Sequence, residues 1–279
     1  MTSEKSVQVG KRKLFSFSRG QLCIPYGLFL ALFVIFPLIV IVYYAFTDAS
    51  GALSLNGFVD FFSNPTKVST LLISIAVSAL TTAICILIAY PVAYILSRMN
   101  KKAAMLILLL FITPMWINFV LRAMAMKEVL YLIGVPFGSF ANMVGLVYDF
   151  LPFMILPLYS TLIKMDKSLE EAAFDLGAGK AKVFMKITLP LSMSGIISGA
   201  MMVFLPVMSC YVITDTFSGA QGFSVIGKLI AWCFIGENGM QMDVNGGAAI
   251  SLIMLTIMFI TMLLTGGFKS ESGARGTDL

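Results

Sequence analysis

Long runs of uncharged, apolar residues constrain this chain more than any other feature of its sequence. The first run extends from Leu22 to Phe46 and contains no Asp, Glu, Lys or Arg over about 25 residues. A helix of about 20 apolar residues crosses the hydrocarbon core of a bilayer, and the backbone inside that core must satisfy its own hydrogen bonds. We therefore predict an all-α integral membrane protein with six transmembrane helices, at Leu22–Phe46, Val68–Leu96, Ala103–Val120, Asn142–Ile163, Leu191–Thr214 and Gly246–Phe268.

The composition supports a membrane protein and excludes several other classes. Hydrophobic residues make up 59% of the 279 residues and charged residues only 12%. The chain has no histidine, which is the commonest metal ligand and general base. Its four cysteines form no C-x-x-C pair, so we expect neither a metal site nor a disulfide framework. The net charge of +5 is spread over loops, which argues against nucleic-acid binding.

Lysine and arginine are distributed unevenly between the loops. Of the 19, 15 fall in the two termini and the loops on their side, and four fall on the opposite side: Lys67, Arg122, Lys127 and Lys228. Positive residues are enriched on the cytoplasmic side. We therefore predict cytoplasmic tails at 1–21 and 269–279 around a six-helix domain at 22–268, whose loop 164–190 also faces the cytoplasm. The uncleaved first run is expected to be retained as a span.

The loop contains a polar stretch between two spans, from Glu170 to Pro190. Leu169, Ala172, Ala173 and Leu176 recur with the spacing of one helical face. Gly177 and Gly179 indicate a turn, after which a helical pattern resumes and extends to Pro190. We predict two short helices in water, whose apolar stripe docks against another protein.

Seven residues of this stretch match the EAA motif, which reads E-A-A, three residues, G, nine residues, I-x-L-P: Glu171, Ala172, Ala173, Gly177, Ile187, Leu189 and Pro190. The chain thereby resembles the permeases of ABC importers. Over nearly its whole length it resembles, more narrowly, spermidine/putrescine permeases of the PotB type. The resemblance implies a type I importer (MetI-like) fold, in which the motif, with Asp175 inside it, forms a coupling helix that fits a groove on an ATPase subunit. The alternative is an ordinary loop helix on the membrane surface.

The resemblance also implies partners. These are a second, homologous permease, two ATPase subunits, a periplasmic substrate-binding protein and the lipid bilayer of a bacterial inner membrane. ATP and Mg would be used by the ATPase, and this chain would bind no cofactor. Gly222–Lys228 has the G-x-x-x-x-G-K spacing with which a phosphate-binding loop begins. Leu229 stands at the next position, where such a loop requires Ser or Thr. With no nucleophile–base pair either, we predict that the chain is not an enzyme.

Acidic and aromatic residues near the outer ends of the spans are candidates for the substrate pathway. Asp149 lies inside the fourth span beside Tyr148, Asp215 closes the fifth one helical turn after Tyr211, and Trp116 lies in the third. Carboxylates and aromatic rings suit an organic cation. Asp149 could instead pair with a neighbouring subunit or with water, Asp215 could be an interfacial residue in water, and Trp116 could anchor the chain at the interface.

Two further patterns concern helix packing and helix breaks. Gly195 and Gly199 form G-x-x-x-G, which allows close packing within the chain or across a subunit interface. Prolines inside the third to fifth spans either serve transport or are simply common in membrane helices.

An ATPase-independent, ion-coupled carrier or channel for organic cations is the alternative function. It predicts an inverted repeat and ionisable groups near the midplane, and the sequence shows no convincing repeat. The motif is shared by importers of many solutes, so it leaves the cargo open.

Overall fold

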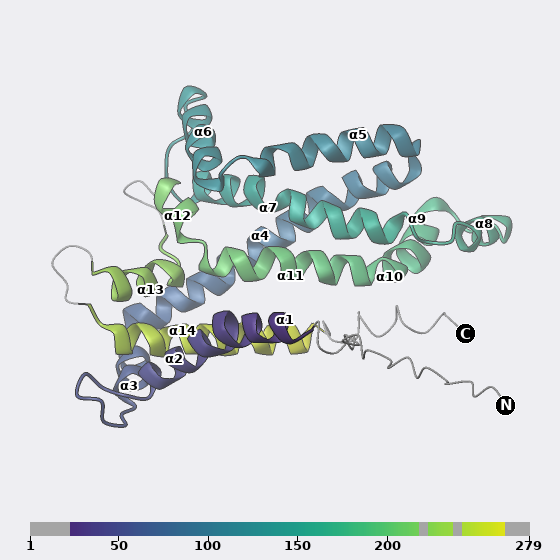
Figure 1. Ribbon diagram of the computed structural model, residues 1–279. Coiled ribbons are helices and arrows are strands. Elements are labelled where there is room, and N and C mark those ends of the chain that lie inside the picture. Colours follow the sequence, from purple (N-terminus) through teal and green to yellow (C-terminus); the bar gives the residue numbers. More distant parts are fainter. Residues whose placement is uncertain (1–22, 218–222, 237–241, 266–279) are drawn as a thin grey trace, which may run out of the picture.

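The computed structural model describes residues 23–217, 223–236 and 242–265, and within them it is built from helices (Figure 1). Four helical runs are long and apolar enough to cross a membrane. They are α1 (Cys23–Leu30) continued through a π-helical turn (Ala31–Ile35) into α2 (Phe36–Ala45), then α4 (Pro65–Arg98), α7 (Ser139–Leu162) and α14 (Val244–Leu264).

Two further runs are bent pairs of helices. In one, α5 (Lys101–Ile112) and a 3₁₀ turn (Thr113–Trp116) meet α6 (Phe119–Leu132) at 101°. In the other, a continuous run meets α11 (Met193–Ser209) at 61°. That run comprises α9 (Lys180–Val183), a π-helical turn (Phe184–Thr188) and α10 (Leu189–Leu191). The number of spans reaches the predicted six only if each bent pair counts as one span, and the bounds of these two differ from the prediction.

Short helices lie at both ends of the long ones. In Figure 1, α3 (Asn56–Ser63), α6, α12 (Tyr211–Phe217) and α13 (Ile226–Ile235) lie at one end. At the other end lie α8 (Ser168–Asp175), α9 and the turn between α4 and α5. The first described residues of α1 and the last of α14 point toward this second end. The two termini of the helical domain therefore share a side with the α8–α9 segment.

The core is formed by α4, α7 and α11, which pack against one another. A Cβ atom at Gly195 of α11 would lie 2.7 Å from Oγ1 of Thr161, and one at Gly199 would lie 2.6 Å from the sulfur of Met154. Both neighbours belong to α7. The G-x-x-x-G pattern therefore serves close packing within the chain.

Small polar residues let α4 pack closely although it is long. Ser74, Ser78 and Thr82 are buried on one face, and each hydroxyl donates to the backbone carbonyl four residues earlier at 2.7 Å. These bonds satisfy the hydroxyls inside the helix itself. As a result α4 buries polar side chains without needing water.

The third span ends earlier than predicted. We expected it to continue to Val120, but the helix ends before Pro114, and Val120 belongs to α6. Pro114 lies in the 3₁₀ turn, and the side chain of Asn118 accepts a hydrogen bond from the amide of Val120 at 2.9 Å. This N-cap starts a new helix in a new direction.

The fifth span is also shorter than predicted. It was expected to run from Leu191 to Thr214, whereas α11 ends at Ser209, Cys210 interrupts the helix and α12 follows. The sixth span matches the prediction as far as Leu264, and Phe268 lies outside the described residues.

Candidate functional site

The segment that carries the EAA motif folds as a helical hairpin, α8 and the α9–α10 run, which we call the coupling hairpin (residues 168–191). Gly177 ends α8 with φ +80°, a conformation that other residues adopt only with strain. Its amide donates to the carbonyl of Phe174 at 2.9 Å, and the amide of Ala178 donates to that of Ala173 at 3.0 Å. This pair of bonds is a Schellman motif, which fixes the reversal predicted at this glycine.

The motif residues lie mainly on the open surface of the coupling hairpin. Leu169 is 49% exposed and Leu176 is 89% exposed, although both are large apolar side chains. The predicted coupling residues divide into exposed ones, Glu171, Ala172, Asp175, Gly177 and Pro190, and half-buried ones, Ala173, Ile187 and Leu189. An apolar stripe that none of the described residues covers is typical of a docking surface.

A groove separates the two helices of the hairpin. It has a volume of about 290 Å³ and is lined by residues from both sides, including Ala173, Gly177, Val183 and Ile187. Lys182 and Lys186 also line it. The groove therefore combines an apolar floor with positive charge, which suits a partner helix with an apolar ridge and acidic flanks.

Glu170 lies on the inner side of α8 and is only 5% exposed. One carboxylate oxygen forms an ion pair with Arg98 at the end of α4, and the other accepts a hydrogen bond from Oγ1 of Thr188 at 2.8 Å. Burial raises the pKa of Glu170, but the bonds from Arg98 and Thr188 outweigh it and hold the pKa below its usual value. The carboxylate is thus charged, and each of its oxygens has a donor.

Aromatic rings support the same contact. The ring of Phe184 meets those of Tyr90 and Tyr94 of α4 edge-on, at 5.5 and 6.0 Å between centroids. The guanidinium of Arg98 lies 5.1 Å from the centroid of the Tyr94 ring. The hydroxyls of Tyr90 and Ser192 are hydrogen-bonded at 2.8 Å. The coupling hairpin is therefore attached to α4 by both of its helices.

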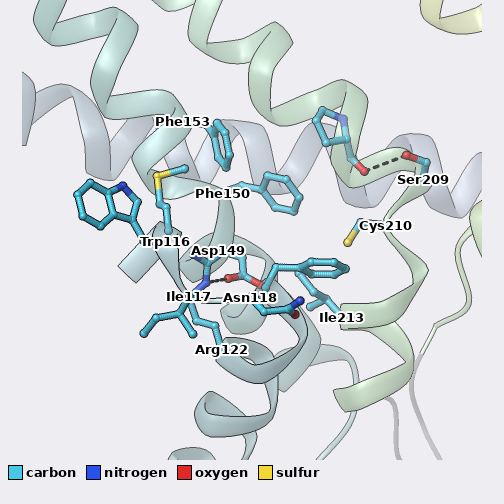
Figure 2. Close-up of a pocket in the computed structure, with 13 residues that line it drawn as sticks. Trp116, Ile117, Asn118, Arg122, Asp149, Phe150, Phe153, Ser209, Cys210 and Ile213 are labelled. Carbon is cyan, nitrogen blue, oxygen red and sulfur yellow. Dashed lines mark hydrogen bonds and ion pairs between the residues drawn. The ribbon is translucent and has the colours of Figure 1, made fainter. Parts of the chain in front are cut away.

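A second site is a cavity of about 600 Å³ near the opposite end, at the bend between α5 and α6 (Figure 2). We call it the outer pocket. Residues from the bend, α7, α11 and α12 line it: Met115, Trp116, Ile117, Asn118, Phe119, Arg122, Asp149, Phe150, Phe153, Pro206, Ser209, Cys210 and Ile213. Trp116 is 84% exposed at its rim.

Arg122 and Asp149 form an ion pair in the wall of the outer pocket, and they are 9% and 3% exposed. The guanidinium also donates to the carbonyl of Pro114 at 3.1 Å. The other oxygen of Asp149, Oδ2, is buried and has no hydrogen-bond partner among the described residues. A buried acceptor without a donor is costly, so this carboxylate is only partly satisfied within the described residues.

The structure brings together only two of the five predicted pathway residues. Asp149 and Trp116 line the outer pocket, whereas Tyr148 does not. Tyr211 lines a separate cavity of about 400 Å³ between α11, α13 and α14. Asp215 forms an ion pair with Lys228 of α13 on the surface. Among the described residues, no cluster of acidic or cysteine side chains could hold a metal ion.

Sequence reasoning missed the partners of both buried acids. Arg122 was assigned to an outer loop, and Glu170 was grouped with the solvated charges of the hairpin. A signal existed for Arg122, because a carboxylate inside a span needs a cation and Pro114 with Asn118 marks a chain break next to it. For Glu170 the sequence offers no comparable signal, because Glu171 beside it is equally acidic and points into solvent.

Comparison with known proteins decides the family. A model of the binding-protein-dependent transport system inner membrane component matches residues 86–269. The chain belongs to this family. The spermidine/putrescine transport system permease protein PotB of Escherichia coli is 35% identical over 218 residues, which cover 72% of this chain and 78% of the relative. PotB of Haemophilus influenzae is 31% identical over 254 residues, covering 83% and 88%.

Solved structures agree on the fold of this permease. A chain of a bacterial ABC transporter involved in the import of the acidic polysaccharide alginate superposes with a TM-score of 0.68 at 15% identity, covering 88% of this chain and 93% of that one. The MetNI methionine ABC transporter gives a TM-score of 0.50 at 19% identity, covering 76% and 96%. The predicted all-α importer-permease fold is confirmed. The chain is a membrane-embedded component of a transport complex that contains other subunits.

Proposed function

We propose that this permease is one of two membrane-spanning subunits of an ATP-driven polyamine importer, and that it forms half of the translocation pathway. The exposed coupling hairpin carries the proposal, because an apolar, rigidly turned surface outside the membrane requires a partner. That partner is an ATPase subunit, which binds ATP and Mg. This chain transmits the motion of the ATPase and binds no cofactor itself.

The orientation follows from charge. The loops that share a side with the coupling hairpin hold most of the chain's lysine and arginine, so that side faces the cytoplasm. The ends of the described helical domain, at Cys23 and Thr265, lie there as well, and the predicted tails at 1–21 and 269–279 lie outside the described residues. Two ATPase subunits dock at that side, one on each permease, and a periplasmic substrate-binding protein delivers substrate at the opposite side, beside α3, α6 and α12.

The importer works by alternating access, in which ATP binding and hydrolysis shift the population of inward-open and outward-open states. When ATP draws the two ATPase subunits together, each coupling hairpin moves with the subunit that it docks on. The permeases tilt and open outward, the binding protein releases its substrate, and hydrolysis returns them inward. The ion-coupled alternative receives no support from the comparisons.

Spermidine and putrescine are the proposed substrates, because the PotB relatives transport them by name. The outer pocket supports this choice through its aromatic walls and the unpartnered oxygen of Asp149. An ammonium group would donate to Oδ2 and lie against the rings of Phe150, Phe153 and Trp116. Tyr148, Tyr211 and Asp215 remain predictions for other stretches of the pathway.

The proposed function is tested by copurification in mild detergent. The wild-type chain is expected to retain an ATPase subunit. Gly177→Asp is expected to lose it, because Asp would be strained at φ +80° and would place a negative charge at the docking turn. Glu171→Lys reverses a charge in the same surface and is expected to weaken the complex.

Gly134→Asp is the matched control, because Gly134 has φ +76° in the turn after α6, away from the coupling hairpin. It carries the same backbone strain and charge without touching the docking surface. Equal loss of the ATPase in both glycine variants would contradict the proposed contact, as would a wild-type chain that retains no ATPase.

A further inference from the structure

We propose that Glu170 is a positioning residue that joins the coupling hairpin to α4 of the same chain, so that displacement of α8 by the ATPase moves α4. The inference deepens the proposed function and rests on it. It concerns a buried acid that lies beside the motif's own Glu171 and faces the opposite way. The route through α4 differs from the covalent route into α7.

The burial of Glu170 is the first observation. The coupling hairpin is exposed on most sides, yet this carboxylate is 5% exposed. Carboxylates are rarely buried unless they are paired. Its two oxygens contact two different segments, Arg98 at the last turn of α4 and Thr188 in the second helix of the hairpin. A single side chain thereby joins three segments.

The covalent path from α8 is the weaker mechanical link. Residues 163–167, which connect α7 to α8, form turns without regular helix. Turns absorb displacement by changing their backbone angles, whereas the ion pair of Arg98 with the buried carboxylate of Glu170 resists separation because that carboxylate would be left without its partner. Motion of α8 is therefore passed on more directly by Glu170 and Arg98 than by the backbone.

The attachment of the second hairpin helix strengthens the same route. Phe184 packs on the rings of Tyr90 and Tyr94, and the Tyr94 ring also faces the guanidinium of Arg98. The last turns of α4 thus hold both hairpin helices. From there α4 continues for 34 residues, packing on α7 and α11, to the end of the molecule where α3 lies. A displacement applied to α8 accordingly reaches the core and the outer side.

The test uses the assembled transporter in proteoliposomes, with this chain, its partner permease, the ATPase subunits and the binding protein. The measured quantity is the amount of labelled spermidine taken up for each ATP hydrolysed. Glu170→Gln removes the charge but keeps the size. It is expected to lower this ratio about tenfold, with copurification of the ATPase unchanged. The charge-swapped variant Arg98→Glu/Glu170→Arg is expected to recover part of the ratio.

Glu128→Gln is the control, because Glu128 is an exposed acid on α6 at the other end of the molecule. It is expected to leave the ratio unchanged. An unchanged ratio in Glu170→Gln would overturn the proposal. So would a parallel fall of uptake and hydrolysis, since that would show only less assembled transporter.

If Glu170→Gln fails to assemble, two milder variants decide. Arg98→Lys keeps the charge and Thr188→Val removes one hydrogen bond, and both are expected to lower the ratio; a normal ratio in either would overturn the proposal. The wild-type transporter is measured first. Absence of ATP-driven uptake there would contradict the proposed function itself, which separates that failure from failure of the α4 route.

Discussion

Two ion pairs between an arginine and a buried carboxylate stand at opposite ends of this permease, and they differ in how completely the acid is satisfied. At the inner end, Glu170 uses both oxygens, one for Arg98 and one for Thr188. At the outer end, Asp149 uses one oxygen for Arg122 and leaves Oδ2 without a partner among the described residues. Both pairs join a guanidinium to a carboxylate, but only Asp149 has an oxygen without a hydrogen-bond donor.

The difference teaches what each pair can do. An ion pair whose buried acid has a donor on each oxygen resists separation, and it suits a joint between moving parts. An acid with one unpaired oxygen beside a cavity of about 600 Å³ can accept another donor. The pair in the outer pocket has no net charge, so hydrogen bonding and ring faces, rather than long-range attraction, would hold a cation there.

The largest effect is expected from Arg122→Leu, which breaks the outer pair. It leaves Asp149 charged and buried, and it also removes a donor from the carbonyl of Pro114. Removing one partner of a buried pair costs about 3–5 kcal/mol. The thermal midpoint of the detergent-solubilised protein should fall sharply. The double variant Arg122→Leu/Asp149→Leu should recover most of the loss, and a double variant as unstable as the single one would contradict this account.

Thr188→Val tests how much the hydrogen bond from Thr188 to Glu170 stabilises the protein. It takes the donor from one oxygen of Glu170 while keeping the shape of a side chain that is 1% exposed. Leaving a buried acceptor unpaired costs about 1–3 kcal/mol, so the thermal midpoint should fall less than in Arg122→Leu. Thr66→Val, at an exposed position near the start of α4, is the control. Equal midpoints in the two variants would show that Glu170 does not depend on this bond.

Asp149→Asn tests whether Oδ2 of Asp149 accepts a hydrogen bond from the substrate. The amide can still accept from Arg122, but an NH₂ group replaces Oδ2. Loss of a hydrogen bond to a charged group, about 1.5 kcal/mol, corresponds to about tenfold lower spermidine uptake. Uptake is divided by the amount of assembled complex, because the uncompensated charge of Arg122 also lowers stability. Uptake per complex equal to that of the wild type would remove Asp149 from the pathway.

The smallest effect is a pH dependence. The pKa of Glu170 is lowered in the folded protein from an ordinary value of 4.5, so its stabilising contribution is complete above that value and is lost as the pH falls through the folded pKa. Thermal midpoints measured from pH 7 to pH 3 should drop less steeply below about pH 4.5 for Glu170→Gln than for the wild type. If the thermal midpoints of the two proteins fell in parallel with pH, the pKa of Glu170 would not differ between the folded and unfolded states.

The sequence predicts the long spans well where one helix crosses without interruption. The fourth span was placed at Asn142–Ile163 and α7 occupies Ser139–Leu162, because length and apolar composition decide such a helix locally. It predicts the bent pairs less well. Pro114 was read as a proline inside a span, and the helix that follows the bend is joined to α7 by the contact between Arg122 and Asp149, 27 residues apart.

The two sites show the same limit. The turn at Gly177 was predictable, because a glycine in the EAA motif and a positive φ are local properties. The burial of Glu170 was not, because its partners Arg98 and Thr188 are brought to it by the packing of α4 against the coupling hairpin. Likewise, Asp149 was singled out by its depth in the membrane, but its pairing with Arg122 required the bend to be known.

The most direct test of the central claim is reconstitution of spermidine uptake with and without the ATPase subunits. Proteoliposomes that contain both permeases, the ATPase, the binding protein and ATP on the ATPase side are expected to accumulate spermidine, and omission of either the ATPase or ATP should abolish accumulation. Accumulation by the purified chain alone, driven by an ion gradient, would contradict the account.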